Sequence, residues 1–193
     1  MLAKNTLKAI RSNQAAIFVV HQSNKLTMKS VAIFLLLITV LSSCKHERES
    51  QGTDAELYEL AKATSGFVWY KQNSNLLDKS AGSGHPQPFL RTRYNSTAAT
   101  QLGSDGKVKT DAVFANGSLI VKELHASASS LARYAILYKN PLSEDADSRG
   151  WVWGYIDADG NVAQTASNKG SACISCHSQE GSIDYTLMNI SFP

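Results

Sequence analysis

Two cysteines and a histidine near the end of the chain have the spacing of a haem-attachment motif, Cys173-x-x-Cys176-His177. In c-type cytochromes two such thiols hold the haem covalently and the adjacent histidine binds the iron. We therefore predict one covalently bound haem c, with His177 as the proximal iron ligand. The alternatives are a redox Cys-x-x-Cys pair and half of a zinc site, but no second pair of ligands accompanies the motif.

The sixth iron position is less well defined by the sequence. Small class I cytochromes close it with a later methionine, but only Met188 follows His177, and we expect Met188 in the core. The four-helix cytochromes c′ carry the motif near the C-terminus, whereas this chain has strand patterns instead. His85, in a loop before Pro86, is a candidate distal group or second axial ligand, and otherwise polar surface. An open distal site favours ligand binding or chemistry over simple electron transfer.

A short helix and a long loop are predicted ahead of the strands. Asp54 offers an N-cap, and "AELYELAKA" places Leu57, Leu60 and Ala61 on one helical face. The stretch "SNLLDKSAGSGHPQP" follows it and is rich in Gly, Ser and Pro, as loops are. "STAATQL" predicts a second short helix.

From residue 89 onward the apolar pattern changes to a period of two, which is typical of strands. We predict α+β architecture: an antiparallel sheet of about five strands, a few flanking helices and one c-type haem. Trp151, Trp153 and Tyr155 share one strand face and should pack the sheet or the haem wall. Four segments carry the strand pattern: "FLRTRY", "SLIVKEL", "ARYAILYK" and "WVWGYID".

Lys122 lies inside one of these apolar strands. On a strand, Ile120, Lys122 and Leu124 share one face, and Leu119, Val121 and Glu123 share the other. Whichever face is buried therefore carries a charge that needs a partner or a chemical change. The alternative is an edge strand from which the lysine side chain reaches water.

Four blocks of the chain resemble, in the same order, those of the cytochrome P-460 family, which includes the cytochromes c′-β. The blocks are "FLRTRYNSTAATQ", "FANGSLIVKEL", "WVWGYID" and "CISCHSQEGSIDYTL". The resemblance covers roughly residues 85–190 and implies a homodimer with a five-coordinate haem that acts on small nitrogen compounds. In the P-460 enzymes the lysine matching Lys122 is bonded to the haem, the substrate is hydroxylamine, and a partner protein accepts the electrons. Family members without that bond bind nitric oxide.

Other parts of the site are weaker matches. Arg91, Arg93 and Arg133 are candidates to pair with haem propionates, with ordinary surface positions as the alternative. The P-460 enzymes also use a distal carboxylate for proton transfer. No residue of this chain matches it clearly, which weakens the case for hydroxylamine oxidation and leaves a non-enzymatic nitric oxide-binding protein, or a six-coordinate electron-transfer cytochrome, as alternatives.

The N-terminal region predicts export. "VAIFLLLITV" at residues 31–40 is too short for a comfortable membrane span and matches a secretory signal that starts at Met28. Leu41-Ser42-Ser43-Cys44 resembles a bacterial lipobox, so we expect lipid on Cys44 and a location on the cell envelope facing the periplasm. An ordinary signal-peptidase region or a short anchor is the alternative. The predicted division is an extension at 1–27, a signal peptide at 28–43, a tether at 44–53 and a haem domain at 54–193.

Removing the signal changes the charge. The formal net charge of +3 includes five basic residues and no acidic ones within residues 1–43, so 14 basic and 16 acidic side chains remain. A slightly acidic mature chain gives no support for nucleic-acid binding.

Overall fold

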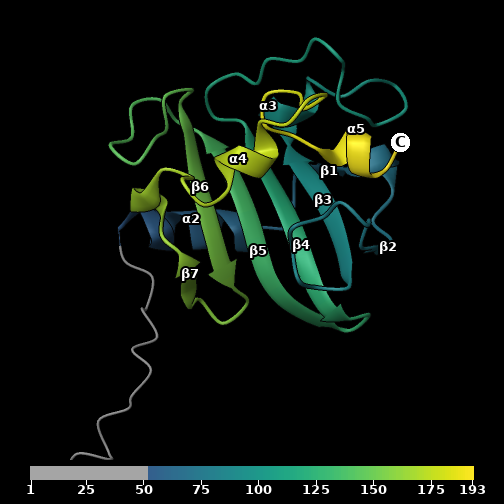
Figure 1. The fold of residues 1–193 in the computed structure, drawn as a ribbon, viewed down its shortest axis with the longest axis horizontal. Coiled ribbons are helices and arrows are strands. Elements are labelled where there is room, and N and C mark those ends of the chain that lie inside the picture. The colour runs from purple at the N-terminus through teal and green to yellow at the C-terminus, as the bar shows by residue number, and fades with distance from the viewer. Residues whose placement is uncertain (1–51) are drawn as a thin grey trace, which may run out of the picture. The chain divides into compact units, whose positions relative to one another are not determined.

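One antiparallel sheet forms the centre of the described chain (Figure 1). The structure is a computed structural model, and it describes residues 52–193. The strand order is β1-β3-β4-β5-β6-β7, and β2 pairs with the same strand, β3, as β1 does. The strands are β1 (Phe67–Trp69), β2 (Leu77–Asp78), β3 (Phe89–Asn95), β4 (Leu119–Ser127), β5 (Ser130–Lys139), β6 (Trp151–Asp157) and β7 (Val162–Gln164).

The predicted α+β class with an antiparallel sheet is confirmed, and the four strands expected from alternation are β3 to β6. The sheet has seven strands rather than about five. The additional strands, β1, β2 and β7, have two or three residues each. A segment so short cannot show an alternating pattern, so its pairing is visible only in the fold.

Four α-helices and two short 3-10 turns complete the described fold: α2 (Thr53–Lys62), η2 (Tyr70–Gln72), α3 (Ser96–Ala99), η3 (Ala166–Asn168), α4 (Ile174–His177) and α5 (Met188–Ser191). The expected helices at α2 and α3 are both present. Asp54 does not cap α2 as predicted, because Gly52 holds the N-cap position. The Asp54 carboxylate instead accepts hydrogen bonds from the backbone of Ala166 at 2.7 Å and the hydroxyl of Thr165 at 2.6 Å, and so ties α2 to the segment after β7.

Both faces of the sheet are covered. Helix α2 packs on one face through Leu57 and Ala61, and the C-terminal segment with α4 and α5 lies over the other (Figure 1). This two-sided burial explains why β4 is apolar in consecutive positions rather than in alternate ones. Gly154 in β6 permits the close approach of α2, since a Cβ there would lie 2.9 Å from Leu57 Cδ1.

Several predictions concern residues outside the described range. The extension at 1–27, the signal peptide at 28–43, most of the tether and the lipid on Cys44 all fall there. Within residues 52–193, no helix is long and apolar enough to cross a membrane.

Candidate cofactor-binding site

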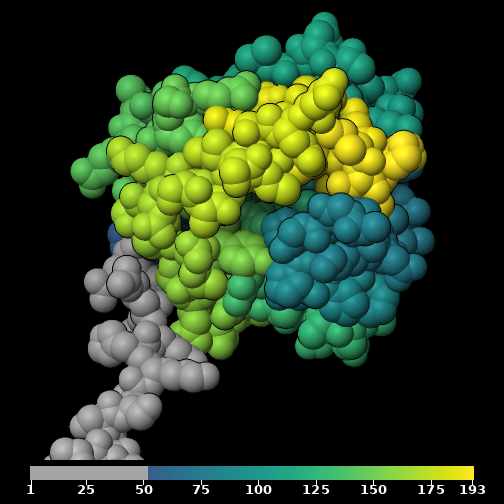
Figure 2. Space-filling view, viewed as in Figure 1, coloured from purple at the N-terminus to yellow at the C-terminus, as the bar shows by residue number. Residues whose placement is uncertain are grey.

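A cavity of about 310 Å³ lies on the sheet face away from α2. This is within the size range of pockets for small molecules and cofactors. Strands β3 to β6 form its floor, and its walls come from residues 82–85 and residues 170–191. In the space-filling view the yellow-green C-terminal segment and the blue segment that precedes β3 lie on the same face, with a recess between them (Figure 2).

The strand register sets the arrangement of the cavity floor. Thr92, Lys122, Ala135 and Tyr155 are successive cross-strand partners from β3 to β6 and form one row. Directly opposite residues in adjacent antiparallel strands have neighbouring side chains, so Lys122 stands in the middle of this row. The next row is Tyr94, Ile120, Leu137 and Trp153.

The predicted motif forms a single helical turn at the cavity wall. Cys173 is partly buried, Cys176 is exposed, and both thiols are free. The backbone N–H of His177 donates to the carbonyl of Cys173 at 3.0 Å. Residues three and four positions apart share one side of a helical turn, so both thiols and the imidazole are presented together. All three residues line the cavity.

His177 is held in one tautomer. Its Nδ1 lies 2.7 Å from the backbone carbonyl of Tyr185, which can only accept, so Nδ1 carries the proton. Burial lowers the pKa of His177, and the ring is neutral at pH 7. No hydrogen bond of Nε2 is recorded within residues 52–193, so this nitrogen presents a free lone pair. A neutral imidazole oriented by a backbone carbonyl is the usual state of a metal-ligating histidine.

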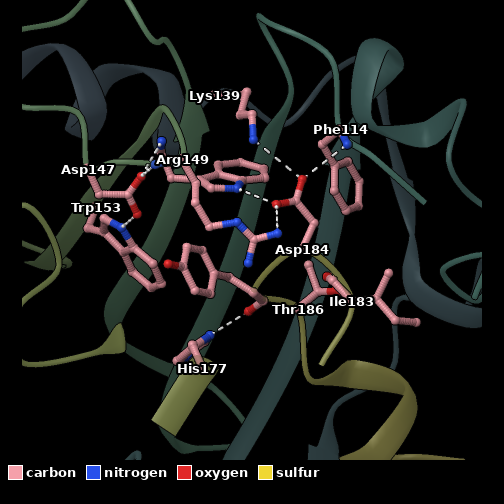
Figure 3. Close-up of polar contacts among 11 residues, drawn as sticks. Phe114, Lys139, Asp147, Arg149, Trp153, His177, Ile183, Asp184 and Thr186 are labelled. Carbon is pink, nitrogen blue, oxygen red and sulfur yellow. Dashed lines mark hydrogen bonds and ion pairs between the residues drawn. The ribbon is translucent and has the colours of Figure 1, made fainter. Parts of the chain in front are cut away.

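The Tyr185 carbonyl is positioned by a strained turn (Figure 3). Asp184 and Tyr185 both have positive φ angles, 43° and 69°, which are rare for residues other than glycine. Ile183 and Thr186 close the turn by pairing with each other. In this turn the carbonyl of Tyr185 lies within hydrogen-bond distance of His177 Nδ1.

Buried Asp184 stabilises this turn through four partners (Figure 3). Its carboxylate accepts a hydrogen bond from the indole of Trp151 at 3.1 Å and from the backbone of Phe114 at 3.2 Å. It also forms ion pairs with Arg149 at 3.0 Å and Lys139 at 3.4 Å. These contacts fix the turn to β5, β6 and the loops beside them.

Lys122 lies in an interior strand, between β3 and β5, so the edge-strand alternative is wrong. Within the described chain no ion pair or hydrogen bond of its amine is recorded. Burial lowers the pKa of Lys122 to about 8, and the nearby Cys176 opposes the shift. On the opposite face Glu123 is paired with Arg91 at 2.6 Å and Arg93 at 3.3 Å. Of Lys122 and Glu123, the residue without a partner is therefore the lysine, which faces the cavity.

His85 also reaches the cavity. Its Nδ1 lies 3.3 Å from the hydroxyl of Tyr155, and the two rings stack with centroids 5.7 Å apart. The ring centroid is 6.4 Å from that of His177. Burial, with Lys122 as the next cause, lowers the pKa of His85 to about 3 and keeps it neutral. The structure thus places His85 in a wall of the cavity, rather than on polar surface.

The three candidate propionate partners have different positions. Arg91 and Arg93 lie on the sheet face opposite the cavity, where Glu123 pairs with both and Arg93 donates to the carbonyl of Ala61. The prediction that Arg91 and Arg93 face the cofactor therefore needs correction, because both residues lie on the sheet face that α2 covers. Arg133 shares the cavity face, is paired with Asp157, and lies over the ring of Tyr155 at 4.5 Å.

Met188 is buried, as predicted, and its sulfur accepts a hydrogen bond from Thr92 at 3.2 Å. Burial raises the pKa of Cys173, opposite to the lowered thiol pKa of redox Cys-x-x-Cys pairs. Among residues 52–193, no group of three or more His, Cys, Asp or Glu is arranged to hold a metal ion. The zinc and redox alternatives thus gain no support from the described residues.

Trp153 and the Asp184–Tyr185 turn are the site features that sequence reasoning did not assign to His177. Trp153 packs edge-on against His177 with centroids 5.3 Å apart, and its indole donates to Asp147 at 2.8 Å. The Asp-Tyr pair was visible only as part of the resembling block after the motif. A positive φ at two residues other than glycine cannot be inferred from their types.

A scan against protein-family models, a search of curated proteins and a search of solved structures each gave no match.

Proposed function

We propose that this chain is a mono-haem c-type protein of the cytochrome P-460 type that binds or oxidises small nitrogen compounds such as hydroxylamine and nitric oxide. One observation carries the proposal. A neutral imidazole, with Nδ1 held by a backbone carbonyl and Nε2 free, lines the same cavity as two free thiols at the haem-attachment spacing. The lysine that the family resemblance singles out faces that cavity too.

The residues of the cavity suit a haem. Cys173 and Cys176 would hold it by thioether bonds, and His177 would bind its iron. Trp153, Tyr155 and Leu137 provide an apolar and aromatic floor for a macrocycle. Haem bound there supplies a redox-active iron for nitrogen ligands. Arg133 remains a candidate for a propionate, because it lies on the cavity face of the sheet.

The chain's own groups then orient and tune the site. Asp184 and the Tyr185 carbonyl fix the ring of His177, while Trp153 packs against its edge. Lys122, with a pKa of about 8, is partly neutral near pH 8 and is then a nucleophile. A bond from its Nζ to a haem ring carbon would replace one N–H and one C–H. Such a bond therefore needs a two-electron oxidant, such as a peroxide, during maturation.

A second candidate function, non-enzymatic nitric oxide binding, is favoured by one observation. No Asp or Glu of residues 52–193 lines the cavity. The P-460 enzymes use a distal carboxylate for proton transfer, so a wall without one favours ligand capture over turnover. A six-coordinate electron-transfer cytochrome is the third candidate.

The location and partners are part of the proposal. Lipid on Cys44 would anchor the domain at the bacterial envelope, facing the periplasm. The resemblance implies a homodimer, and oxidation of a substrate would require a redox partner protein to accept electrons.

The test is a ferrous absorption spectrum of the full chain produced with haem-maturation machinery. A Soret band displaced far to the red supports the Lys122 crosslink, and Lys122→Ala should abolish the displacement while Lys109→Ala, at an exposed lysine, should not. An unshifted spectrum that changes on adding nitric oxide supports the gas-binding candidate. A low-spin spectrum that ignores added ligands, or a chain without covalent haem, would overturn the proposal.

A further inference from the structure

We infer that His85 is a second, displaceable iron ligand in the cavity that His177 also lines, so that small nitrogen compounds bind by replacing it. The inference rests on the proposed haem site, and it departs from the five-coordinate haem that the family resemblance implies, because it gives the site a sixth ligand at rest. It draws on the two imidazoles, on the loop that carries His85, and on the row of the sheet beneath them.

The two imidazoles suit one shared metal ion in the distance between their ring centres and in the ring nitrogen atoms that they could offer it. When two imidazoles ligate one metal ion from opposite sides at about 2.1 Å each, their ring centres lie about 6 Å apart. The observed separation of His85 and His177 is 6.4 Å, with the ring planes at 71°. Each ring has its Nδ1 beside an oxygen atom, the Tyr185 carbonyl for His177 and the Tyr155 hydroxyl for His85. The Nε2 of His177 is thus left available to a metal, and the Nε2 of His85 is available when its Nδ1 carries the proton.

Tyr155 determines whether His85 can serve as a ligand. If Nδ1–H of His85 donates to the Tyr155 oxygen, Nε2 carries a lone pair. Arg133 lies over the Tyr155 ring and, like His85, is on the cavity side of the sheet. This phenol oxygen would take the place of the carboxylate, carbonyl or water that commonly accepts the second N–H of a ligating histidine.

The loop that carries His85 is suited to release it. Its base is closed by a hydrogen bond of 2.7 Å from the Lys79 N–H to the Pro88 carbonyl. Between these residues there is no helix or strand, and a Cβ at Gly82 or Gly84 would meet nothing within 4 Å. The side-chain hydrogen bond of His85, at 3.3 Å, is long. Few contacts therefore oppose an outward movement of this loop.

Lys122 is the rival donor, because its amine faces the same cavity. It differs from His85 in its position, since it extends from the floor formed by an interior strand and cannot move away with a loop. A ligand from the floor would be fixed, whereas one from the loop is replaceable. A sixth ligand that can be replaced distinguishes the proposed state from an electron-transfer cytochrome.

The experiment uses the haem-loaded full chain and records ferric absorption and electron paramagnetic resonance spectra. We expect a low-spin wild type, a high-spin His85→Ala variant, and recovery of the low-spin signal when imidazole is added. Gln87→Ala, two residues along the same loop and outside the cavity lining, should remain low-spin. Removing a competing internal ligand should also lower the apparent Kd for nitric oxide by about tenfold.

The two proposals fail in different ways. A chain that acquires no covalent haem overturns the proposed function and this inference together. Covalent haem with a high-spin wild type, or with a low-spin state that His85→Ala preserves and Lys122→Ala removes, overturns only the inference. If His85→Ala does not load haem, Tyr155→Phe replaces it, and that variant should raise the high-spin fraction. An unchanged spin state in Tyr155→Phe would then overturn the inference.

Discussion

At the scale of single residues, Lys122 shows the cost of placing a charged amine at the floor of a cavity. A charged amine is unfavourable in the interior unless a partner compensates it. Glu123, its neighbour on the strand, forms ion pairs with Arg91 and Arg93, while the Lys122 amine has no ion pair among the described residues. The protein without haem therefore carries an unfavourable term that chemistry at this nitrogen would remove.

We predict that Lys122→Met stabilises the protein without haem by about 3 kcal/mol at pH 7. The folded-state pKa of Lys122 is lowered from 10.5 to about 8, so below pH 8 the amine is charged in both states and its burial destabilises the fold. The advantage should shrink between pH 8 and 10.5, where the wild type loses the charge on folding. Urea unfolding at pH 7 and pH 10 measures this, and an equal advantage at both values would contradict it.

Gly170→Ala should destabilise the same protein by more than about 2 kcal/mol. Gly170 has a φ of 71°, and a Cβ there would lie 2.6 Å from the indole of Trp153. Its carbonyl also accepts the N–H groups of Cys173 and Ile174, which start the turn of the motif. Gly82→Ala is the matched control, because its Cβ meets nothing within 4 Å. Equal stability of the two variants, measured by urea unfolding, would disprove the argument.

At the scale of elements, the turn at residues 183–186 links His177 to the sheet. The turn has a positive φ at two residues other than glycine, and Asp184 stabilises it by contacts with β5, β6 and the loop before β4. These contacts hold the Tyr185 carbonyl in place, although the residues that make them lie up to 70 positions away from Asp184 in the sequence.

Asp184→Asn should lower the free energy of unfolding by about 3 kcal/mol, because a buried partner of two cations is removed. The NH2 group of the introduced amide is a donor, and it would lie against another donor, either Trp151 Nε1 or Phe114 N. Asp111→Asn, at an exposed position, should change stability by less than about 0.5 kcal/mol. Chemical denaturation of both variants checks the difference, and a loss below about 1 kcal/mol in Asp184→Asn would count against the network.

The elements that the sequence predicted are those with a long local pattern. Strands β3 to β6 are each seven residues or longer and rich in β-branched, aromatic and apolar residues, and α2 has a regular apolar face. Strands β1, β2 and β7 form only because neighbours offer edges to pair with. Their existence depends on tertiary structure, which no short window of sequence contains.

The site was predictable to the extent that its chemistry is local. The spacing of Cys173, Cys176 and His177 identifies their turn, and strand parity correctly separates Lys122 from Glu123. The alternation of side chains along a strand could not show which face of the sheet α2 would cover. Arg91 and Arg93 of β3 were expected at the cofactor, whereas they lie on the opposite face of the sheet, where both pair with Glu123.

At the scale of the whole molecule, the N-terminal region carries the proposed lipid anchor. Residues 1–51 lie outside the described structure, and the proposed anchor, Cys44, is among them. Between Cys44 and α2 the sequence "KHERESQG" is polar and lacks periodicity. A polar stretch of this kind suits a tether between an anchor and a folded domain.

Cys44→Ala should move the protein from the membrane fraction to the soluble fraction when it is expressed in a bacterium that processes lipoproteins. The wild type should incorporate radiolabelled fatty acid and the variant should not, because the lipid is attached to that sulfur. Ser43→Ala, next to it, should retain the label. Equal labelling of the wild type and Cys44→Ala would refute lipidation at this cysteine.

The order of the elements along the chain implies an order in which the parts of the proposed cofactor site form. Every strand of the sheet ends by Gln164, before Cys173. A chain that is made and exported from its N-terminus therefore presents all its strands before the two thiols emerge. The sheet that forms the floor of the cavity can then fold first, and the haem would be attached to a late segment that closes over a hollow already built.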